Sequence, residues 1–400
     1  MFRCFETTIK RQFCQIFGYV DLIAWKYGKN IYNEYRMAIK IVDATLREGR
    51  QSLFFDTILH MQDEYLDIIS RMGVFDVEYR NPSVNVEELE NYKRLKNKFS
   101  NIRFHVHIFL NKTNVEWVIG DPSVEYISTF VRLPMTETSQ ADLSRLLHGT
   151  SKKIRVGIEH AALASEETLV HLIGLLKNET SVDRISFSDT LGNFTPERIH
   201  LFLEQVQKVG LHDKNIEFHL HNDFGLAAAN AVQLLSEANS ISNTIYFSTS
   251  MFGIGERNGI LSYGDLLSNM IRLEISPDLD LEVYSELVKL MEKNNVCFNR
   301  DPISQTAFTH FASSHIIGET GDSMYHIISP DELGMTQQFV FNNLTGQNVF
   351  KHVAETMLQQ TVSDDGSFIR DFVFQKMKEQ NNPFLCLEEV VVLLREFYKI

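Results

Sequence analysis

The strongest constraint on the fold is a regular alternation of β-rich runs with stretches of helical length between residues 38 and 275. Eight runs are rich in β-branched and aromatic residues, and they span residues 38–46, 74–80, 102–109, 126–133, 153–160, 182–189, 216–223 and 244–253. The stretches that follow these runs predict helices at residues 56–72, 86–99, 112–120, 138–149, 165–178, 196–209, 226–238 and 263–272. Eight strand–helix pairs in about 240 residues predict an α/β protein of the (β/α)8 TIM barrel class. A doubly wound open sheet is the alternative.

The chain divides into three parts by pattern. The alternation stops near Pro277, and the residues beyond it show helical periods without a strand pattern. We therefore expect an N-terminal extension at residues 1–36, a catalytic barrel at 37–275, and mostly helical C-terminal subdomains with a lid at 276–400. The first residues mix basic and aromatic side chains, which matches an organelle-targeting segment only weakly. An additional packed segment, or a start at Met37, explains them as well.

Composition excludes several classes of function. The chain has 52 acidic and 38 basic side chains, a net charge of −14, which argues against binding to nucleic acid. Cys4, Cys14, Cys297 and Cys386 form no C-x-x-C pair, so neither a thiolate zinc site nor a disulfide framework is indicated. No apolar run is long enough to span a membrane. These observations fit a protein of the reducing cytoplasm.

In a parallel barrel, catalytic groups lie at the C-terminal ends of the strands, and the unusual polar residues follow this rule. Around the seventh run, "EFHLHND" places Glu217, His219, His221 and Asp223 at alternate positions, so that they share one face of a strand. Two imidazoles joined by a carboxylate from another strand can hold a divalent cation and leave positions open for substrate. A hydrogen-bonded pair of core histidines is an equally good explanation of H-x-H alone.

Two further segments supply polar groups at strand ends. In "DATLREGRQ" at residues 43–51, Arg47 offers a fork of donors for a carboxylate or an oxyanion, and Glu48 offers hard oxygen ligands. Taken singly, both could be a solvated loop pair. In "GIGERNGI" at residues 253–260, three glycines permit tight turns, but the spacing is not that of a dinucleotide-binding loop.

In combination and in this order, "DATLREGRQ", "SFSDTLGNFTPE", "EFHLHNDFGLAAANAV" and "GIGERNGI" resemble the barrel metalloenzymes of the isopropylmalate synthase and homocitrate synthase family. The resemblance spans roughly residues 38 to 352, and "AFTH" with the later "DELGM" is closer to homocitrate synthase. It implies an acyltransferase that condenses acetyl-CoA with a 2-oxo acid, 2-oxoglutarate in homocitrate synthases, and then hydrolyses the thioester. It also implies one divalent metal ion (Zn²⁺, Mn²⁺ or Mg²⁺), acetyl-CoA as co-substrate, and a homodimer whose lid crosses to the partner subunit.

The same resemblance assigns roles to individual residues. The implied metal ligands are Glu48, His219 and His221, and the implied catalytic residues are Arg47, His315, Tyr325 and Glu217. His315 is the candidate base for the acetyl methyl proton, whereas Glu217 either orients a ligand or transfers a proton. The residues expected to line the substrate pocket are Gln51, Glu78, His107, Arg155, Glu159, Thr190 and Arg50. Arg155 would pair with the distal carboxylate of the acceptor; a structural ion pair is its alternative role.

The acceptor pocket departs from the homocitrate synthase pattern. Arg50 replaces a glutamate, the second run ends in "EYRNP" with Arg80, and the fifth ends in "RVGIEH" with His160 in place of an acid. We therefore expect an acceptor with more negative charge or different reach than 2-oxoglutarate. Two other functions stay open: a lyase of the same barrel group that cleaves a hydroxy-acyl thioester or an aldol, and a non-catalytic barrel used for binding.

Overall fold

The computed structural model describes residues 38–211, 213–298, 300, 308–321, 325, 330, 336–362 and 366–399. The N-terminal extension expected at residues 1–36 lies outside the described residues. Residues 39–400 form one unit. Within the described part, no helix combines the length and the apolar character needed to cross a membrane.

The core of the chain is a closed barrel of eight parallel strands in sequence order, as the alternation predicts. The strands are β1 Ala38–Asp43, β2 Asp76–Arg80, β3 Arg103–Ile108, β4 Tyr126–Val131, β5 Lys153–Ile158, β6 Val182–Asp189, β7 Asn215–Leu220 and β8 Thr244–Thr249. A hydrogen bond from Ala44 N to Thr249 O joins the first strand to the last (2.8 Å). Because side chains alternate along a strand, one set fills the barrel and the other contacts the helices.

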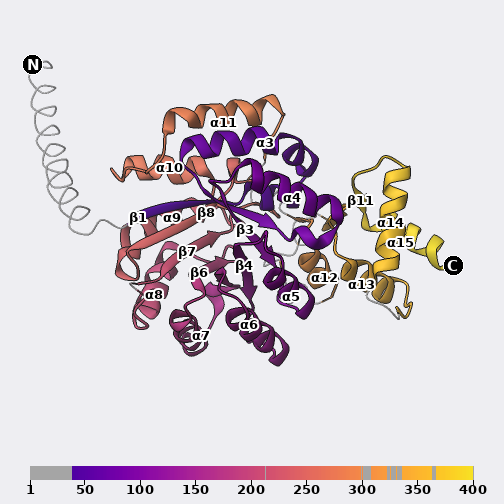
Figure 1. Cartoon of the computed structure of the whole chain (residues 1–400), viewed down its shortest axis with the longest axis horizontal. Coiled ribbons are helices and arrows are strands. Elements are labelled where there is room, and N and C mark those ends of the chain that lie inside the picture. Colours follow the sequence, from indigo (N-terminus) through magenta and orange to yellow (C-terminus); the bar gives the residue numbers. More distant parts are fainter. Residues whose placement is uncertain are drawn as a thin grey trace, which may run out of the picture. The chain divides into compact units, whose positions relative to one another are not determined.

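Eight helices surround the strands (Figure 1), each following one strand. They are α3 Phe55–Met72, α4 Val86–Lys98, α5 Lys112–Gly120, α6 Glu137–Gly149, α7 Glu166–Asn178, α8 Pro196–Gln207, α9 Ala227–Glu237 and α10 Tyr263–Arg272. Local sequence explains their ends. The Thr195 side chain caps α8 by accepting a hydrogen bond from Arg198 N (3.2 Å), with Pro196 in the first turn. Asn85 caps α4 in the same way, through Glu88 N (2.7 Å).

The turn after β1 differs from the predicted continuation of the strand to residue 46. The chain leaves the sheet at Ala44, whose carbonyl accepts hydrogen bonds from the amides of Arg47 and Glu48. A short helix α2 (Thr45–Glu48) and a 3-10 turn (Gly49–Gln51) follow. A Cβ atom at Gly49 would lie 2.8 Å from Ile254 Cδ1, so this turn packs tightly against the loop after β8.

After the barrel, α11 (Leu281–Lys293) lies beside α3 (Figure 1), where Arg71 pairs with Glu286 at 2.6 Å. The remaining described elements are α12 Ser313–Gly321, α13 Gln347–Met357, α14 Ser367–Glu379 and α15 Leu387–Tyr398, with the strands β9 Thr309–His310, β10 Gln338–Phe341 and β11 Leu385–Cys386. These strands form a small sheet in the order β11-β10-β9. The expectation of helices without strands was therefore wrong here, because two-residue strands are too short to show an alternating pattern.

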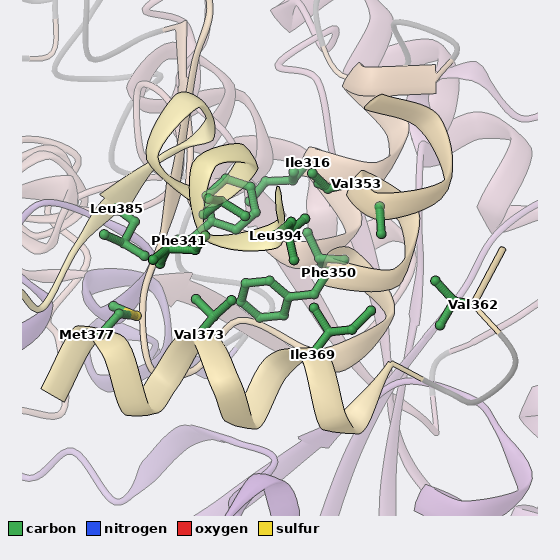
Figure 2. Packing of buried hydrophobic residues seen from close by; sticks show 14 residues of the cluster. Ile316, Phe341, Phe350, Val353, Val362, Ile369, Val373, Met377, Leu385 and Leu394 are labelled. Atoms are coloured by element: carbon green, nitrogen blue, oxygen red, sulfur yellow. The ribbon is translucent and has the colours of Figure 1, made fainter. Parts of the chain in front are cut away.

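The C-terminal elements build a hydrophobic core of their own. Figure 2 shows Phe341 of β10, Phe350 of α13, Val373 of α14 and Leu394 of α15 packed together, and each is fully buried. Ile316 of α12 belongs to the same cluster and is also fully buried. The helix that carries His315 is therefore held by this second core.

Candidate active site

The turn after β1 places a charged pair at the C-terminal end of the barrel. Arg47 Nη2 lies 2.6 Å from Glu48 Oε1, and Arg47 Nε donates a hydrogen bond to Glu78 at the end of β2. All three side chains are buried. Burial raises the pKa of Glu48, and the Arg47 charge opposes this shift. Glu48 Oε2 is buried and has no hydrogen-bond partner, so it is an unused anionic oxygen facing the interior.

The two histidines of H-x-H lie beside this carboxylate. His219 Nε2 is 3.6 Å from Glu48 Oε1, and its Nδ1 lies 3.0 Å from Ser248 Oγ. The rings of His219 and His221 are 5.1 Å apart at their centroids. Burial, followed by the Arg47 charge, lowers the pKa of His219 to about 3. Burial and Arg257 hold the pKa of His221 well below its usual value. Both rings are therefore neutral, the form that binds metal ions.

The donor set of Glu48, His219 and His221 fits a divalent ion. One carboxylate and two neutral imidazoles suit Zn²⁺ or Mn²⁺ better than Mg²⁺, which prefers oxygen ligands. The unpartnered Glu48 Oε2 is the oxygen that such an ion would take. Among the described residues, the group of donors that lie within 4.8 Å of one another is a different one, Glu256 with His310 and His315.

The carboxylate of Glu256 is already occupied by backbone amides. Its oxygens accept hydrogen bonds from Phe311 N (3.0 Å) and Ala312 N (2.9 Å), just before α12. Oε1 is also 3.5 Å from His315 Nδ1 and 3.6 Å from His310 Nδ1. Burial raises the pKa of Glu256 to about 7. This loop after β8 therefore anchors the start of the helix that carries His315.

Arg257, next to Glu256, joins the histidine pair to that helix. Its Nη2 donates to Thr190 O (2.7 Å) and to His221 Nδ1 (3.1 Å). Its Nη1 donates to His315 Nδ1 (3.1 Å), and its Nε donates to Asp223 Oδ1 (2.7 Å). One guanidinium thus holds groups from β6, β7 and the C-terminal region at a single place.

His315 and Tyr325 form a stacked pair above this guanidinium. Their rings are 3.8 Å apart at an angle of 14°. Arg132 Nη2 donates to the Tyr325 hydroxyl, and Arg132 Nε donates to Glu159 Oε2 (2.8 Å). Burial and the Arg257 charge hold the pKa of His315 well below its usual value. The imidazole is therefore neutral and can accept a proton.

Below the mouth, the barrel interior is filled by ion pairs. Arg155 Nη2 contacts Glu217 Oε1 and lies 3.2 Å from Glu78 Oε1. Arg184 bridges Glu217 (3.0 Å) and Asp76 (3.3 Å) one layer further down. Although burial opposes the ionisation of Glu78, Arg47 and Arg155 lower its pKa. Glu217 is therefore held between two guanidinium groups.

Comparisons with known proteins identify the family. A family model described as HMGL-like matches residues 133–291. The mitochondrial homocitrate synthase of Schizosaccharomyces pombe is 28% identical over 90% of this chain and 88% of its own length. The cytosolic isozyme of Saccharomyces cerevisiae is 27% identical over 93% and 88%, and the homocitrate synthase of Pyrococcus horikoshii is 24% identical over 86% and 96%. The chain is a homocitrate synthase-like member of the isopropylmalate synthase and homocitrate synthase family. The resemblance inferred from the motifs is confirmed.

Solved structures agree with this homocitrate synthase-like chain in fold alone. An HMG-CoA lyase from Bacillus subtilis has a TM-score of 0.52 at 16% identity, covering 66% of this chain and 96% of that one. The carboxyl transferase domain of Rhizobium etli pyruvate carboxylase, in complex with pyruvate and biocytin, has a TM-score of 0.54 at 14% identity, with coverages of 90% and 63%. The TM-barrel expectation is confirmed by the eight-stranded closed barrel itself.

Some pocket residues expected in this homocitrate synthase-like chain have other partners. Arg50 donates two hydrogen bonds to Glu88 (2.7 and 2.6 Å), so its charge is paired outside the histidine cluster. His107 Nδ1 is 3.4 Å from Ser128 Oγ, and burial and the Arg47 charge hold its pKa well below its usual value. Gln51 is half-buried in the 3-10 turn.

Sequence reasoning missed Glu256 and Arg257 in the homocitrate synthase-like site. It used "GIGERNGI" only for its glycines. An acid and a base in succession, enclosed by glycines at the C-terminal end of a barrel strand, were a usable sign, because charged residues are seldom buried unless they are paired.

Proposed function

We propose that this chain condenses acetyl-CoA with a 2-oxo acid. The methyl group of acetyl-CoA loses a proton, and its carbon forms a bond with the ketone carbon of the acceptor. The ketone oxygen becomes an alkoxide and is protonated. Water then cleaves the thioester and releases free CoA. The relatives named homocitrate synthase, which match most of the chain, support this assignment.

One observation carries the proposal: the Arg257 guanidinium contacts both His221 and His315. The expected metal-binding pair and the expected base therefore meet at one place, although almost 100 residues of sequence separate them. Carbon–carbon bond formation requires an activated ketone and a base within reach of the attacking methyl group. The two functions are adjacent here.

The roles of the residues follow from their charges. A divalent ion held by Glu48, His219 and His221 would supply Lewis-acid polarisation of the ketone. Arg47, beside Glu48, would stabilise the negative charge that develops on the ketone oxygen. His315, as a neutral imidazole, would take the methyl proton. We propose that Glu217, held by Arg155 and Arg184, positions the layer beneath the substrate.

Tyr325 would orient the base. Its ring stacks on His315, and its hydroxyl accepts a hydrogen bond from Arg132, which Glu159 holds in turn. Burial, and then the Glu159 charge, raise the pKa of Tyr325, so the phenol stays protonated. The stacked pair thereby fixes the plane of the imidazole.

We further propose a homodimer and a cytoplasmic location. Within the chain described here, the lid contacts its own barrel; exchange of the lid between two subunits would keep the same residue pairs. The names of the relatives include both mitochondrial and cytosolic enzymes. Light scattering on the purified protein measures the assembly, and a monomer at micromolar concentration would exclude the dimer.

The test of function is an assay of free thiol released from acetyl-CoA in the presence of individual 2-oxo acids, with mass spectrometry of the product. The protein should first be supplied with Zn²⁺ or Mn²⁺. We expect thiol release that depends on the oxo acid, and a product heavier than the acceptor by one acetyl unit. Thiol release without a new carbon–carbon bond, or none with any acceptor, would exclude a synthase.

A lyase is the second candidate, and it is the weaker one. HMG-CoA lyases share the barrel fold at 16% identity and cover 66% of this chain. The contacts of His315 and Tyr325 come from the region beyond the barrel. Incubation with a 3-hydroxy-3-methylglutaryl thioester distinguishes the two, because a lyase would release acetyl-CoA from it.

A further inference from the structure

The arginines at the mouth of the barrel nearly all have a carboxylate partner. The ion pairs are Arg47 with Glu48 and Glu78, Arg50 with Glu88, Arg132 with Glu159, Arg155 with Glu217, and Arg257 with Asp223. Arg80, the last residue of β2, is the exception among these positions, since it makes no ion pair with any described carboxylate. Its Nη2 donates to a neutral group, Leu344 O, at 3.1 Å.

Arg80 belongs to the inner face of its strand. Alternation places Asp76, Glu78 and Arg80 on the same side of β2, and the first two take part in the ion pairs inside the barrel. Arg80 follows Glu78 by two residues, which is roughly 7 Å further toward the mouth. It is therefore one layer above the Arg47–Glu78 pair and on the side from which a substrate enters.

The surroundings of Arg80 are unfavourable to an unpaired cation. Its Nε is buried and has no hydrogen-bond partner. Burial, and then the neighbouring Arg50 charge, lower the pKa of Arg80 to about 9. Taking a charge out of water is costly unless a counter-ion replaces the lost hydration. An anion at this position would supply that counter-ion and two acceptor oxygens for the planar fork.

We propose that Arg80 binds a second anionic group at the far end of the acceptor, so that the substrate is a 2-oxo acid with a distal carboxylate or phosphonate. This inference rests on the proposed function and names the substrate class of that site. Arg155 is the other candidate for this role, but Glu217 and Glu78 already neutralise it. Arg50 is likewise neutralised, by two hydrogen bonds to Glu88.

The present partner of Arg80 can be replaced. Leu344 O is a neutral acceptor, and charge-assisted hydrogen bonds are roughly twice as strong as neutral ones. The loop around Leu344 is tied to the start of α12 by Gly346 N, which donates to Ser313 Oγ at 2.9 Å. A bound anion would therefore take over a guanidinium that now contacts the C-terminal region.

The experiment compares three acceptors and four proteins. The acceptors are 2-oxobutyrate, with a single carboxylate, and 2-oxoglutarate and 3-phosphonopyruvate, each with a distal anion. The proteins are wild type, Arg80→Met, Arg80→Lys and the control Arg272→Met, which removes an exposed arginine at the end of α10. For at least one distal-anion acceptor, we expect Arg80→Met to lower kcat/KM by roughly 100-fold, mainly through KM.

The other outcomes separate the two hypotheses. For 2-oxobutyrate the change should be under about threefold, and Arg80→Lys should lie between wild type and Arg80→Met because lysine keeps the charge without the fork. Equal loss with all three acceptors, or none with the distal-anion acids, would overturn the role of Arg80 while leaving the synthase intact. If wild type turns over no acceptor, the proposed function fails. The thermal shift caused by 3-phosphonopyruvate or 2-oxoglutarate then decides: it must be present in wild type and absent in Arg80→Met.

Discussion

At the scale of single residues, chemical suitability and actual use diverge. Arg155 and Arg50 both have the fork that a substrate carboxylate needs, yet both are engaged by glutamates. Glu48 is the reverse case, because one of its buried oxygens has no partner. An unpartnered buried polar atom is a better guide to a ligand than residue type is, since desolvation without compensation is unfavourable.

The first prediction concerns Glu48. Glu48→Gln removes the anionic oxygen from the donor set, so we expect the metal content after gel filtration to fall at least tenfold and kcat at least 100-fold. Elemental analysis and the thiol assay measure the two quantities. Glu282→Gln, an exposed position in the first turn of α11, is the control. Full metal content in Glu48→Gln would remove Glu48 from the set of ligands.

The second prediction concerns Asp43, which burial raises to a pKa of about 6 although Tyr65, Tyr263 and Thr45 donate hydrogen bonds to it. Its unfolded pKa is near 3.9. The folded state therefore binds the proton more tightly, and the contribution of Asp43 to stability decreases as pH rises from about 4 to above 6. Between pH 5 and 7.5 this loss is about 1.4 kcal/mol.

Asp43→Asn cannot titrate, so urea unfolding should find that its stability relative to wild type improves by about that amount between pH 5 and 7.5. A pH-independent difference between the two proteins would show that Asp43 is ionised throughout this range. The absolute effect of Asp43→Asn is a separate quantity, because the amide changes the hydrogen bonds of both tyrosines.

The sequence predicted the residue types of the site but not their partners. Alternation placed His219 beside His221, and strand ends placed Arg47 near Glu48. Which carboxylate neutralises which arginine depends on distances between strands that are far apart in the sequence. Arg80 illustrates this point, because its lack of a counter-ion is invisible in "EYRNP".

At the scale of elements, two adjacent strands share a packing device. Phe130 of β4 and Gly157 of β5 are paired in the sheet, and a Cβ at Gly157 would lie 2.2 Å from the Phe130 ring. The ring also lies 4.8 Å from the ring of His107 and 5.1 Å from the Arg155 guanidinium. The missing side chain at Gly157 thus lets an aromatic ring cover the cationic layer inside the barrel.

The third prediction tests this contact. Gly157→Ala must displace the Phe130 ring, so we expect a loss of about 1–3 kcal/mol in stability and a higher KM for the acceptor. The control is Gly174→Ala on α7, where a new Cβ meets nothing within 4 Å and helix propensity alone should slightly stabilise the chain. Chemical denaturation and steady-state kinetics provide both readouts. Unchanged stability in Gly157→Ala would mean that the ring moves without strain.

Elements were predictable where the pattern was long enough. The eight strands and eight helices of the barrel agree with the alternation to within a few residues, because each repeats one periodicity over several positions. The short helix after β1 and the two-residue strands β9 and β11 were missed. Their geometry is set by tertiary hydrogen bonds, such as the one from Ala44 N to Thr249 O, which carry no local periodicity.

At the scale of the whole described unit, two cores stabilise one site. The barrel holds Arg47, Glu48 and the H-x-H pair, whereas the C-terminal cluster holds α12 through Ile316. The base and the metal-binding residues thus depend on different sets of buried side chains. Damage to the second core should therefore affect chemistry before it affects metal binding.

The fourth prediction follows from this division. Phe350 is fully buried in the C-terminal cluster (Figure 2), and Phe350→Ala should destabilise that core by about 3–5 kcal/mol. We expect kcat to fall at least tenfold while the metal content per chain stays the same. Phe202→Ala, in the barrel beside Phe187 and Phe194, is the matched control. Hydrogen exchange should increase in α12 for the first variant only, and equal exchange in both would contradict the division.

The contact between Gly49 and Ile254 has one more consequence. It lies where the first and last strands meet, and a Cβ at Gly255 in the same loop would sit 3.0 Å from Glu48 Oε2. The turn that bears the proposed ligand and the loop that anchors the lid therefore interlock across the seam of the cylinder. Any breathing at this seam would loosen the cation site and release the lid together, so the enzyme would lose both halves of its chemistry in a single motion.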